Sequence, residues 1–191
     1  MSNNEITVKV IVSKEELVKH LEENGFKDLR KFSLDDYYFV PKELDIEKMS
    51  TREIISKAIL VRDIREDKIF KKKLTYKIKD FDENGDIVSQ RAISCNVENI
   101  EDSKKFLEAI GYKEIMNIKE YDTVFGNEKF ELAVKEIKNG DLLIEVETEE
   151  DSEFDTIDKL KKFIDGIKIP IKANEYFVKK AEIELDKILG R

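Results

Sequence analysis

Apolar and ionic side chains alternate along several segments of this chain. Residues 5–12 read Glu-Ile-Thr-Val-Lys-Val-Ile-Val, and lysines alternate with apolar residues again at 71–79. A repeat of two residues is typical of a β-strand that buries one face and exposes the other. We therefore expect a sheet with one apolar face, covered by helices, and one ionic face.

Turn signals and β-branched or aromatic runs divide the rest of the chain into further strands. The sequence Asp-Glu-Asn-Gly-Asp at 82–86 is typical of a hairpin turn, and Gly-Asn and Asn-Gly pairs occur at 126–127 and 139–140. Together these signals predict strands at 34–41, 58–65, 87–98, 114–125, 128–137 and 142–148.

Capping residues and glycines mark the helix ends. Ser13 and Glu16 form the Ser-x-x-Glu pattern of a capping box, and Gly25 and Gly111 are suited to end a helix. In the last predicted helix, an apolar stripe begins at Phe177. Helices are expected between Ser13 and Gly25, at 51–57, at 102–110 with Phe106, Leu107 and Ile110 on one side, at 155–164 and at 174–189.

The composition limits the class of protein. The chain has 191 residues with 43 acidic and 35 basic side chains, which gives a formal net charge of −8. The 11 Phe and 6 Tyr argue against disorder, and no apolar run is long enough to span a membrane. We expect one α+β domain over 1–191, in a cytoplasmic protein that binds neither membranes nor nucleic acid.

The single histidine and the single cysteine exclude several kinds of site. One cysteine rules out an internal disulfide, and one histidine rules out a site that needs two imidazoles. Cys95 and His20 could act as nucleophile and base. We favour the simpler alternative, in which His20 lies at the surface on the polar side of its helix.

The ionic faces of the predicted strands carry both cations and carboxylates. A solvated face is the simpler explanation for any one strand. If the faces instead line one cavity, lysines and arginines there repel one another unless an anion lies between them, and carboxylates beside them suit a divalent metal ion. Phosphoryl chemistry requires this combination of cations and metal-binding carboxylates. The pattern therefore favours a polyphosphate site.

Several short motifs follow one another along nearly the whole chain. The opening Glu5-Ile-Thr-Val-Lys9 is the first, and Leu74-Thr-Tyr-Lys77 is the most distinctive. In this order they resemble the CYTH family, the triphosphate tunnel metalloenzymes, which includes class IV adenylate cyclases, thiamine triphosphatases and inorganic triphosphatases. The other matching segments are Asp36-Tyr-Tyr-Phe-Val-Pro41, Ala58-Ile-Leu-Val-Arg62, Arg91, Lys119, Leu142 to Glu147 and Asn174-Glu-Tyr176.

The resemblance implies a fold and a set of site residues. The implied fold is a single-domain, eight-stranded antiparallel β-barrel that forms a tunnel, with helices packed outside. The implied ligand is a small molecule with a triphosphate, bound together with Mg²⁺ or Mn²⁺. The matching phosphate-binding cations are Lys9, Arg62, Lys77, Arg91 and Lys119, and the matching metal-binding carboxylates are Glu5, Glu145 and Glu147.

The chain departs from the family pattern mainly at metal-binding positions. A threonine removes one carboxylate ligand, and a lysine at another acidic position raises the electrostatic cost of holding a cation. We therefore expect weak or conditional metal binding at a degenerate metal site. The departures are Thr7 and Lys135 for carboxylates, Leu60 and Tyr121 for arginines, and Ile93 and Cys95 for acidic residues after Arg91.

Three functions are consistent with these residues. The first is metal-dependent hydrolysis of an inorganic or organic triphosphate. The second is a related reaction, the cyclisation of ATP by its ribose 3′-hydroxyl group. The third is a non-catalytic module that binds polyphosphate or a nucleotide, which Thr7 and Lys135 favour. These patterns do not identify a catalytic residue. They also leave open which triphosphate is bound and whether the protein forms a homodimer.

Overall fold

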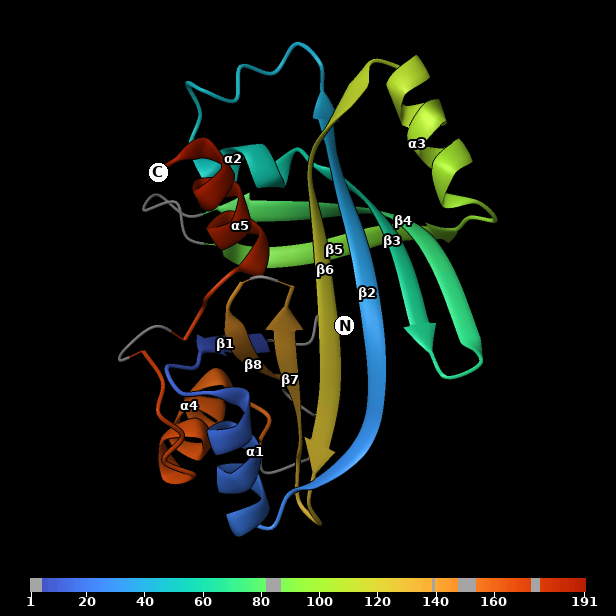
Figure 1. The fold of residues 1–191 in the computed structure, drawn as a ribbon. Coiled ribbons are helices and arrows are strands. Elements are labelled where there is room, and N and C mark those ends of the chain that lie inside the picture. Colours follow the sequence, from blue (N-terminus) through green and yellow to red (C-terminus); the bar gives the residue numbers. More distant parts are fainter. Residues whose placement is uncertain (1–4, 82–86, 139, 148–153, 173–175) are drawn as a thin grey trace. The chain divides into compact units, whose positions relative to one another are not determined.

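The computed structural model describes residues 5–81, 87–138, 140–147, 154–172 and 176–191. Within them the chain forms eight strands and five helices (Figure 1). The strands are β1 (Glu5–Lys9), β2 (Lys27–Pro41), β3 (Ile59–Glu66), β4 (Ile69–Phe81), β5 (Ile87–Asn96), β6 (Tyr112–Gly126), β7 (Glu131–Ile137) and β8 (Leu142–Glu147). The helices are α1 (Lys14–Glu23), α2 (Thr51–Ser56), α3 (Ile100–Ala109), α4 (Ile157–Gly166) and α5 (Lys180–Leu189).

The strands belong to one eight-stranded sheet. Their order is β1-β8-β7-β6-β2-β3-β4-β5. The ladders β1/β8, β7/β8, β6/β7, β2/β3, β3/β4 and β4/β5 are all antiparallel. Within the described residues, the ladders do not join β1 to β5. The predicted α+β class with an eight-stranded antiparallel sheet is confirmed.

The chain divides into two compact units. Unit 1 contains residues 3–32 and 120–179, and unit 2 contains 33–119 and 180–191. The long strands β2 and β6 contribute residues to both units. A single domain over 1–191 stays a prediction.

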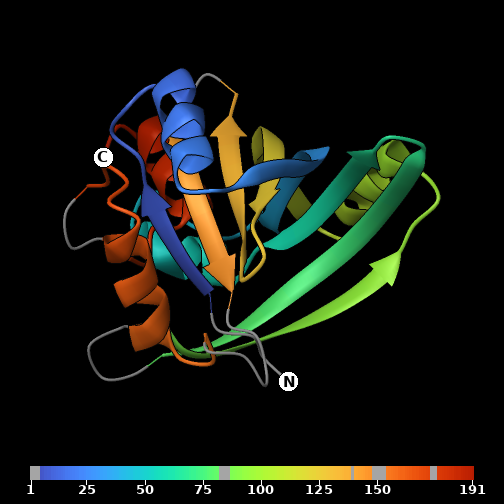
Figure 2. The same ribbon diagram turned by 90° about the horizontal axis from the view of Figure 1, so that it is seen from below.

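Unit 1 has a core between one face of its strands and two helices. Ile6 and Val8 of β1 are fully buried, as the alternation predicted, and pack in the same cluster as Leu17 of α1 and Leu160 of α4. Figure 2 shows α4 beside β1. Four rings extend this core from the loops and α4, with neighbouring ring centroids 4.6 to 6.2 Å apart: Phe26, Phe130, Phe154 and Phe163.

Unit 2 has a smaller core under α3. Leu107 of α3 packs with Phe39 of β2 and Val61 of β3. Leu107 is the one buried residue of the predicted apolar side of this helix, since Phe106 is 60% and Ile110 is 54% exposed. An α-helix rotates by about 100° per residue, so Phe106 is turned away from the face that carries Leu107.

Helices α2 and α5 pack together within unit 2 (Figure 1). The hydroxyl group of Thr51 donates a hydrogen bond to Asp186, and Arg52 forms an ion pair with Glu182 at 3.3 Å. Arg191 follows α5 and donates hydrogen bonds to the backbone carbonyls of Ile46, Glu47 and Met49. These contacts hold the end of the chain against α2 and the loop before it.

The structure confirms the predicted start of α1 and the predicted ends of α1 and α3. Ser13 and Glu16 form the capping box of α1, and Gly25 and Gly111 follow their helices with φ of +81° and +95°. Helix α5 begins at Lys180, whereas the prediction placed its start at 174. The backbone at 176–178 is instead extended, because the amide of Thr7 donates to the carbonyl of Tyr176 and the amide of Val178 donates to that of Thr7.

Some predictions lie outside the described residues. These are the turn at 82–86, part of the turn at 139–140, and the start of the last predicted helix. In the part of the chain that the structure describes, no helix is both long and apolar enough to cross a membrane.

Candidate functional site

Cross-strand pairing gathers three glutamates on one face of unit 1. Glu5 of β1 pairs directly with Glu147 of β8, and the next pair on the same face joins Thr7 to Glu145. One carboxylate oxygen from each of the three glutamates lies within 4.8 Å of the other two. Hard oxygen ligands of this kind and number suit Mg²⁺ or Mn²⁺. The three carboxylates are therefore ligands of the kind that a divalent cation binds.

Lys135 lies among carboxylates on this same face. Its Nζ atom is 3.1 Å from Oε1 of Glu145, 3.4 Å from Oδ2 of Asp122 and 3.9 Å from Oε1 of Glu120. The side chain of Lys135 is 12% exposed, and those of Glu120 and Asp122 are fully buried. Burial by itself lowers the pKa of Lys135, but Glu145, Glu120 and Asp122 raise this pKa well above its usual range. The lysine is therefore charged at neutral pH.

Two further lysines of unit 1 are held by carboxylates. Nζ of Lys179 is 3.0 Å from Oε1 of Glu5, which is one of the three clustered glutamates. Nζ of Lys9, predicted to bind phosphate, is 2.7 Å from Oδ1 of Asp141. Two of the three glutamates thus already contact an ammonium group, which lowers their net attraction for a metal ion.

In unit 2, a buried aspartate binds two cations. Arg62 donates from Nε to Oδ1 of Asp36 at 2.6 Å and from Nη2 to Oδ2 at 2.7 Å, and Lys180 donates to Oδ2 at 2.8 Å. Asp36 is fully buried. Burial opposes its ionisation, but Lys180 and Arg62 outweigh this effect and lower the pKa of Asp36 from 3.8 to about 2.

The register separates the predicted phosphate-binding residues of unit 2 between two faces. Arg62 pairs with Lys73, which is four residues from Lys77, so Arg62 and Lys77 share a face. Lys77 pairs with Ala92, whereas Arg91 pairs with Ile78, and alternation places Arg91 on the other face.

Lys119 is also turned away from the face of Arg62. Its Nζ atom lies 3.3 Å from Asp35, whose side chain is on the opposite side of β2 from that of its neighbour Asp36. Lys119 is about half-exposed. Within unit 2 the structure therefore places Arg62 and Lys77 on one face of the sheet, and places neither Arg91 nor Lys119 on that face.

The residues that depart from the family pattern have varied positions. Thr7 is buried beside Glu145, and Leu60 is buried on the face of Arg62. Tyr121 and Ile93 are exposed, as is Cys95. His20 is half-buried rather than at the surface, because its Nε2 atom contacts the carbonyl oxygen of Ile167. His20 and Cys95 belong to different units.

Sequence reasoning missed several charged residues of these clusters. Glu120 and Asp122 are two residues apart in a predicted strand, so the alternation rule could have placed both on one face. The sequence motif includes Asp36 but did not indicate that this aspartate binds Arg62 and Lys180. No local signal marks Lys179 or Lys180, because their partners are more than 140 residues away in the sequence.

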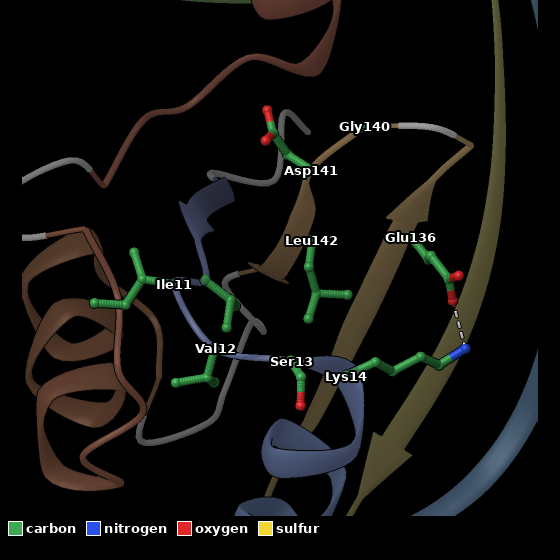
Figure 3. Close-up of a pocket in the computed structure, with 9 residues that line it drawn as sticks. Ile11, Val12, Ser13, Lys14, Glu136, Gly140, Asp141 and Leu142 are labelled. Atoms are coloured by element: carbon green, nitrogen blue, oxygen red, sulfur yellow. Dashed lines mark hydrogen bonds and ion pairs between the residues drawn. The ribbon is translucent and has the colours of Figure 1, made fainter.

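A hollow of about 370 Å³ lies elsewhere in unit 1, at the start of α1 (Figure 3). Ile11, Val12 and Leu142 line it, and the ion pair of Lys14 with Glu136 lies at its side. Its lining includes none of the three clustered glutamates. It is therefore separate from the candidate metal-binding residues.

Comparison with solved structures relates the whole chain to known folds. PH1819 protein from Pyrococcus horikoshii OT3 is 20% identical, with a TM-score of 0.70 over 97% of this chain and 99% of that chain. HpAC1 from Hippeastrum, named as an adenylyl cyclase with a dominant triphosphatase activity, is 15% identical, with a TM-score of 0.60 over 94% and 93%. A protein from Vibrio parahaemolyticus that has been proposed to be an adenylate cyclase is 10% identical, with a TM-score of 0.58 over 97% of each chain.

These likenesses concern the fold. The identities are at most 20%, and the solved structures are matched over almost their whole length. No model of a known protein family matches the sequence, and no curated protein matches it. A shared fold does not by itself define an activity, which depends on the residues of the site.

Proposed function

We propose that this chain, which has the CYTH-like fold, binds a small molecule with a triphosphate and hydrolyses it with the help of a divalent cation. The observation that carries the proposal is the cluster of Glu5, Glu145 and Glu147, with ligand atoms within 4.8 Å of one another. Paired strands β1 and β8 hold these carboxylates, so their spacing follows from the sheet itself.

The proposed reaction breaks a phosphoanhydride bond. A water oxygen forms a bond to the terminal phosphorus as the bond from that phosphorus to the bridging oxygen breaks. The water gives up a proton, the diphosphate part of the substrate leaves with the bridging oxygen, and the terminal phosphoryl group becomes orthophosphate. A divalent ion bound by the three glutamates would supply positive charge to the phosphate oxygens during this step. In unit 1 we propose that Lys9 binds phosphate oxygens. In unit 2, taken by itself, Arg62 and Lys77 are the residues that we propose as phosphate ligands.

The residues around the glutamates support weak or conditional metal binding. Lys135 contacts Glu145 at 3.1 Å, and Lys179 contacts Glu5 at 3.0 Å. Each ammonium group offsets part of the charge that would attract a cation. A triphosphate that brings its own oxygen ligands would restore that attraction, so we expect metal and substrate to bind together. Mg²⁺ and Mn²⁺ are the proposed ions.

A second candidate function is a non-catalytic module that binds polyphosphate or a nucleotide. The observation that favours it is Lys135, whose ammonium group lies within 4 Å of Glu120, Asp122 and Glu145, the last of which belongs to the candidate metal cluster. If this lysine keeps the metal ion out, the site could hold a triphosphate without turning it over.

Colorimetric measurement of released phosphate separates the two functions. The protein is incubated with tripolyphosphate, ATP or thiamine triphosphate, each with Mg²⁺, with Mn²⁺ or with EDTA. We expect phosphate release from at least one substrate with a metal ion and none with EDTA. If calorimetry shows triphosphate binding while no substrate releases phosphate, the hydrolase proposal is wrong and the binding module is the better account.

A further inference from the structure

We propose that Lys135 is a built-in cation, whose ammonium group takes the place of a divalent metal ion among Glu120, Asp122 and Glu145. This inference goes beyond hydrolysis, because it concerns the cation that this face of unit 1 holds and applies whether or not the protein turns over a triphosphate. We call these three carboxylates the lysine cage.

The lysine cage is assembled by the register of three neighbouring strands. Lys135 of β7 pairs directly with Asp122 of β6, and Glu145 lies on β8, on the other side of β7. Glu120 is two residues before Asp122 and therefore on the same face. The ammonium group thus lies between carboxylates from both neighbouring strands, at 3.1, 3.4 and 3.9 Å.

Burial makes a cation necessary at this position. The side chains of Glu120 and Asp122 are fully buried, and Lys135 is 12% exposed. Carboxylates taken out of water and placed side by side repel one another unless a positive charge lies among them. Three carboxylates around one ammonium group leave a formal charge of −2, so the cage could accept a divalent ion in exchange for the lysine.

The cage also limits how metal binds nearby. Glu145 belongs both to the lysine cage and to the cluster with Glu5 and Glu147. Its contact with Lys135 leaves it less able to bind an ion in that cluster. In the wild-type protein this face therefore already holds the ammonium group of Lys135, and it binds a free divalent ion weakly. Without the ammonium group, the same carboxylates become a divalent-ion site that includes Glu120 and Asp122.

The test replaces the ammonium group by an uncharged side chain of similar length, in Lys135→Met. Mn²⁺ binding is measured by calorimetry without triphosphate, and thermal unfolding is measured in EDTA and in Mn²⁺. The wild type should unfold at the same temperature in both solutions. The variant should bind Mn²⁺ at least about tenfold more tightly than the wild type, because the cage carries a charge of −3. Its Tm should fall in EDTA and recover in Mn²⁺.

Two further variants serve as controls. Lys159→Met removes an exposed lysine that pairs with Asp155 at 2.8 Å, and it should change neither Mn²⁺ affinity nor the effect of EDTA. Lys135→Met combined with Glu120→Gln and Asp122→Asn removes the need for a cation, so this protein should fold in EDTA without a gain in Mn²⁺ affinity.

The outcomes decide the proposal. It is overturned if Lys135→Met is as stable as the wild type in EDTA, or binds Mn²⁺ no more tightly. It is also overturned if the triple variant gains Mn²⁺ affinity equally, since the cage is then not the site. A Lys135→Met protein that is unfolded in EDTA and folded in Mn²⁺ supports the proposal, and one that is unfolded in both contradicts it.

Discussion

Arg62 makes two hydrogen bonds to the carboxylate of Asp36, from Nε at 2.6 Å and from Nη2 at 2.7 Å. Asp36 is fully buried and also accepts a hydrogen bond from Lys180, the first residue of α5. One aspartate therefore joins β2, β3 and α5 within unit 2. It also holds in place an arginine that we propose binds phosphate, so an incoming phosphate must share Arg62 with Asp36.

Asp36→Asn should destabilise the protein by about 3 kcal/mol, because it leaves two cations without their buried counter-charge. Urea unfolding measures the effect. Asp45→Asn is the control, since Asp45 pairs with Lys48 at the surface of the same unit and should cost less than about 1 kcal/mol. Equal stabilities for the two variants would show that Asp36 does not anchor this unit.

The contribution of Asp36 should disappear in acid. Its pKa is about 2 when folded and has an ordinary value of 3.8. Because the folded pKa is the lower one, the stabilisation is present above about pH 4 and is lost as the pH falls to about 2. The difference in unfolding free energy between wild type and Asp36→Asn should shrink by on the order of 2 kcal/mol over that range. A difference that stays constant with pH would contradict the shifted pKa.

Glu147→Gln should reduce metal-dependent phosphate release by about tenfold or more, because it removes one of three oxygen ligands. Glu147 is exposed, so the Tm should change little. Glu131→Gln is the control, as this exposed glutamate of β7 is not in the cluster. Phosphate release that is unchanged in Glu147→Gln would exclude this residue from the metal site.

Lys77→Ala should weaken tripolyphosphate binding by about tenfold to hundredfold, the value of one charge-assisted hydrogen bond. Lys72→Ala is the matched control, because Lys72 lies on the opposite face of β4 and donates to the carbonyl oxygen of Glu98. Calorimetry with both variants measures the effect. Equal affinities would remove Lys77 from the proposed phosphate-binding residues.

Gly25→Ala should destabilise the protein by about 1 kcal/mol, since Gly25 has a φ of +81° that disfavours any side chain. No atom lies within 4 Å of the Cβ position, so the cost is one of backbone conformation alone. Gly166→Ala, at the end of α4, also meets open space without a positive φ, and should be neutral or stabilising by about 0.5 kcal/mol. Thermal unfolding of both variants checks the contrast.

Features with local causes could be predicted from the sequence. The alternation at Glu5, Ile6 and Thr7 predicted β1 and its buried face, because a strand turns successive side chains to opposite sides. Ser13 and Glu16 predicted the start of α1, because a capping box involves four consecutive residues. The resemblance pointed to Glu5, Glu145 and Glu147, whose carboxylates do lie together.

Features that depend on strand register were decided by the tertiary structure. Arg91 and Lys119 occur at the expected places in the motif order, yet a shift of one residue relative to a neighbouring strand turns a side chain to the other face. The positions of Arg91 and Lys119 along the chain do not indicate the register of their strands, and therefore do not indicate the face on which each side chain lies.

The sequence by itself determined that this chain forms strands with ionic faces and brings glutamates to them, because side-chain alternation is a property of each strand alone. Only the tertiary structure decided which charges meet. Lys135 contacts Glu120, Asp122 and Glu145 because β7 lies between β6 and β8 in one particular register, and Lys180 reaches Asp36 from 144 residues away. Electrostatic energy depends on distance in space, and that distance is set by the packing of segments that are remote in the sequence.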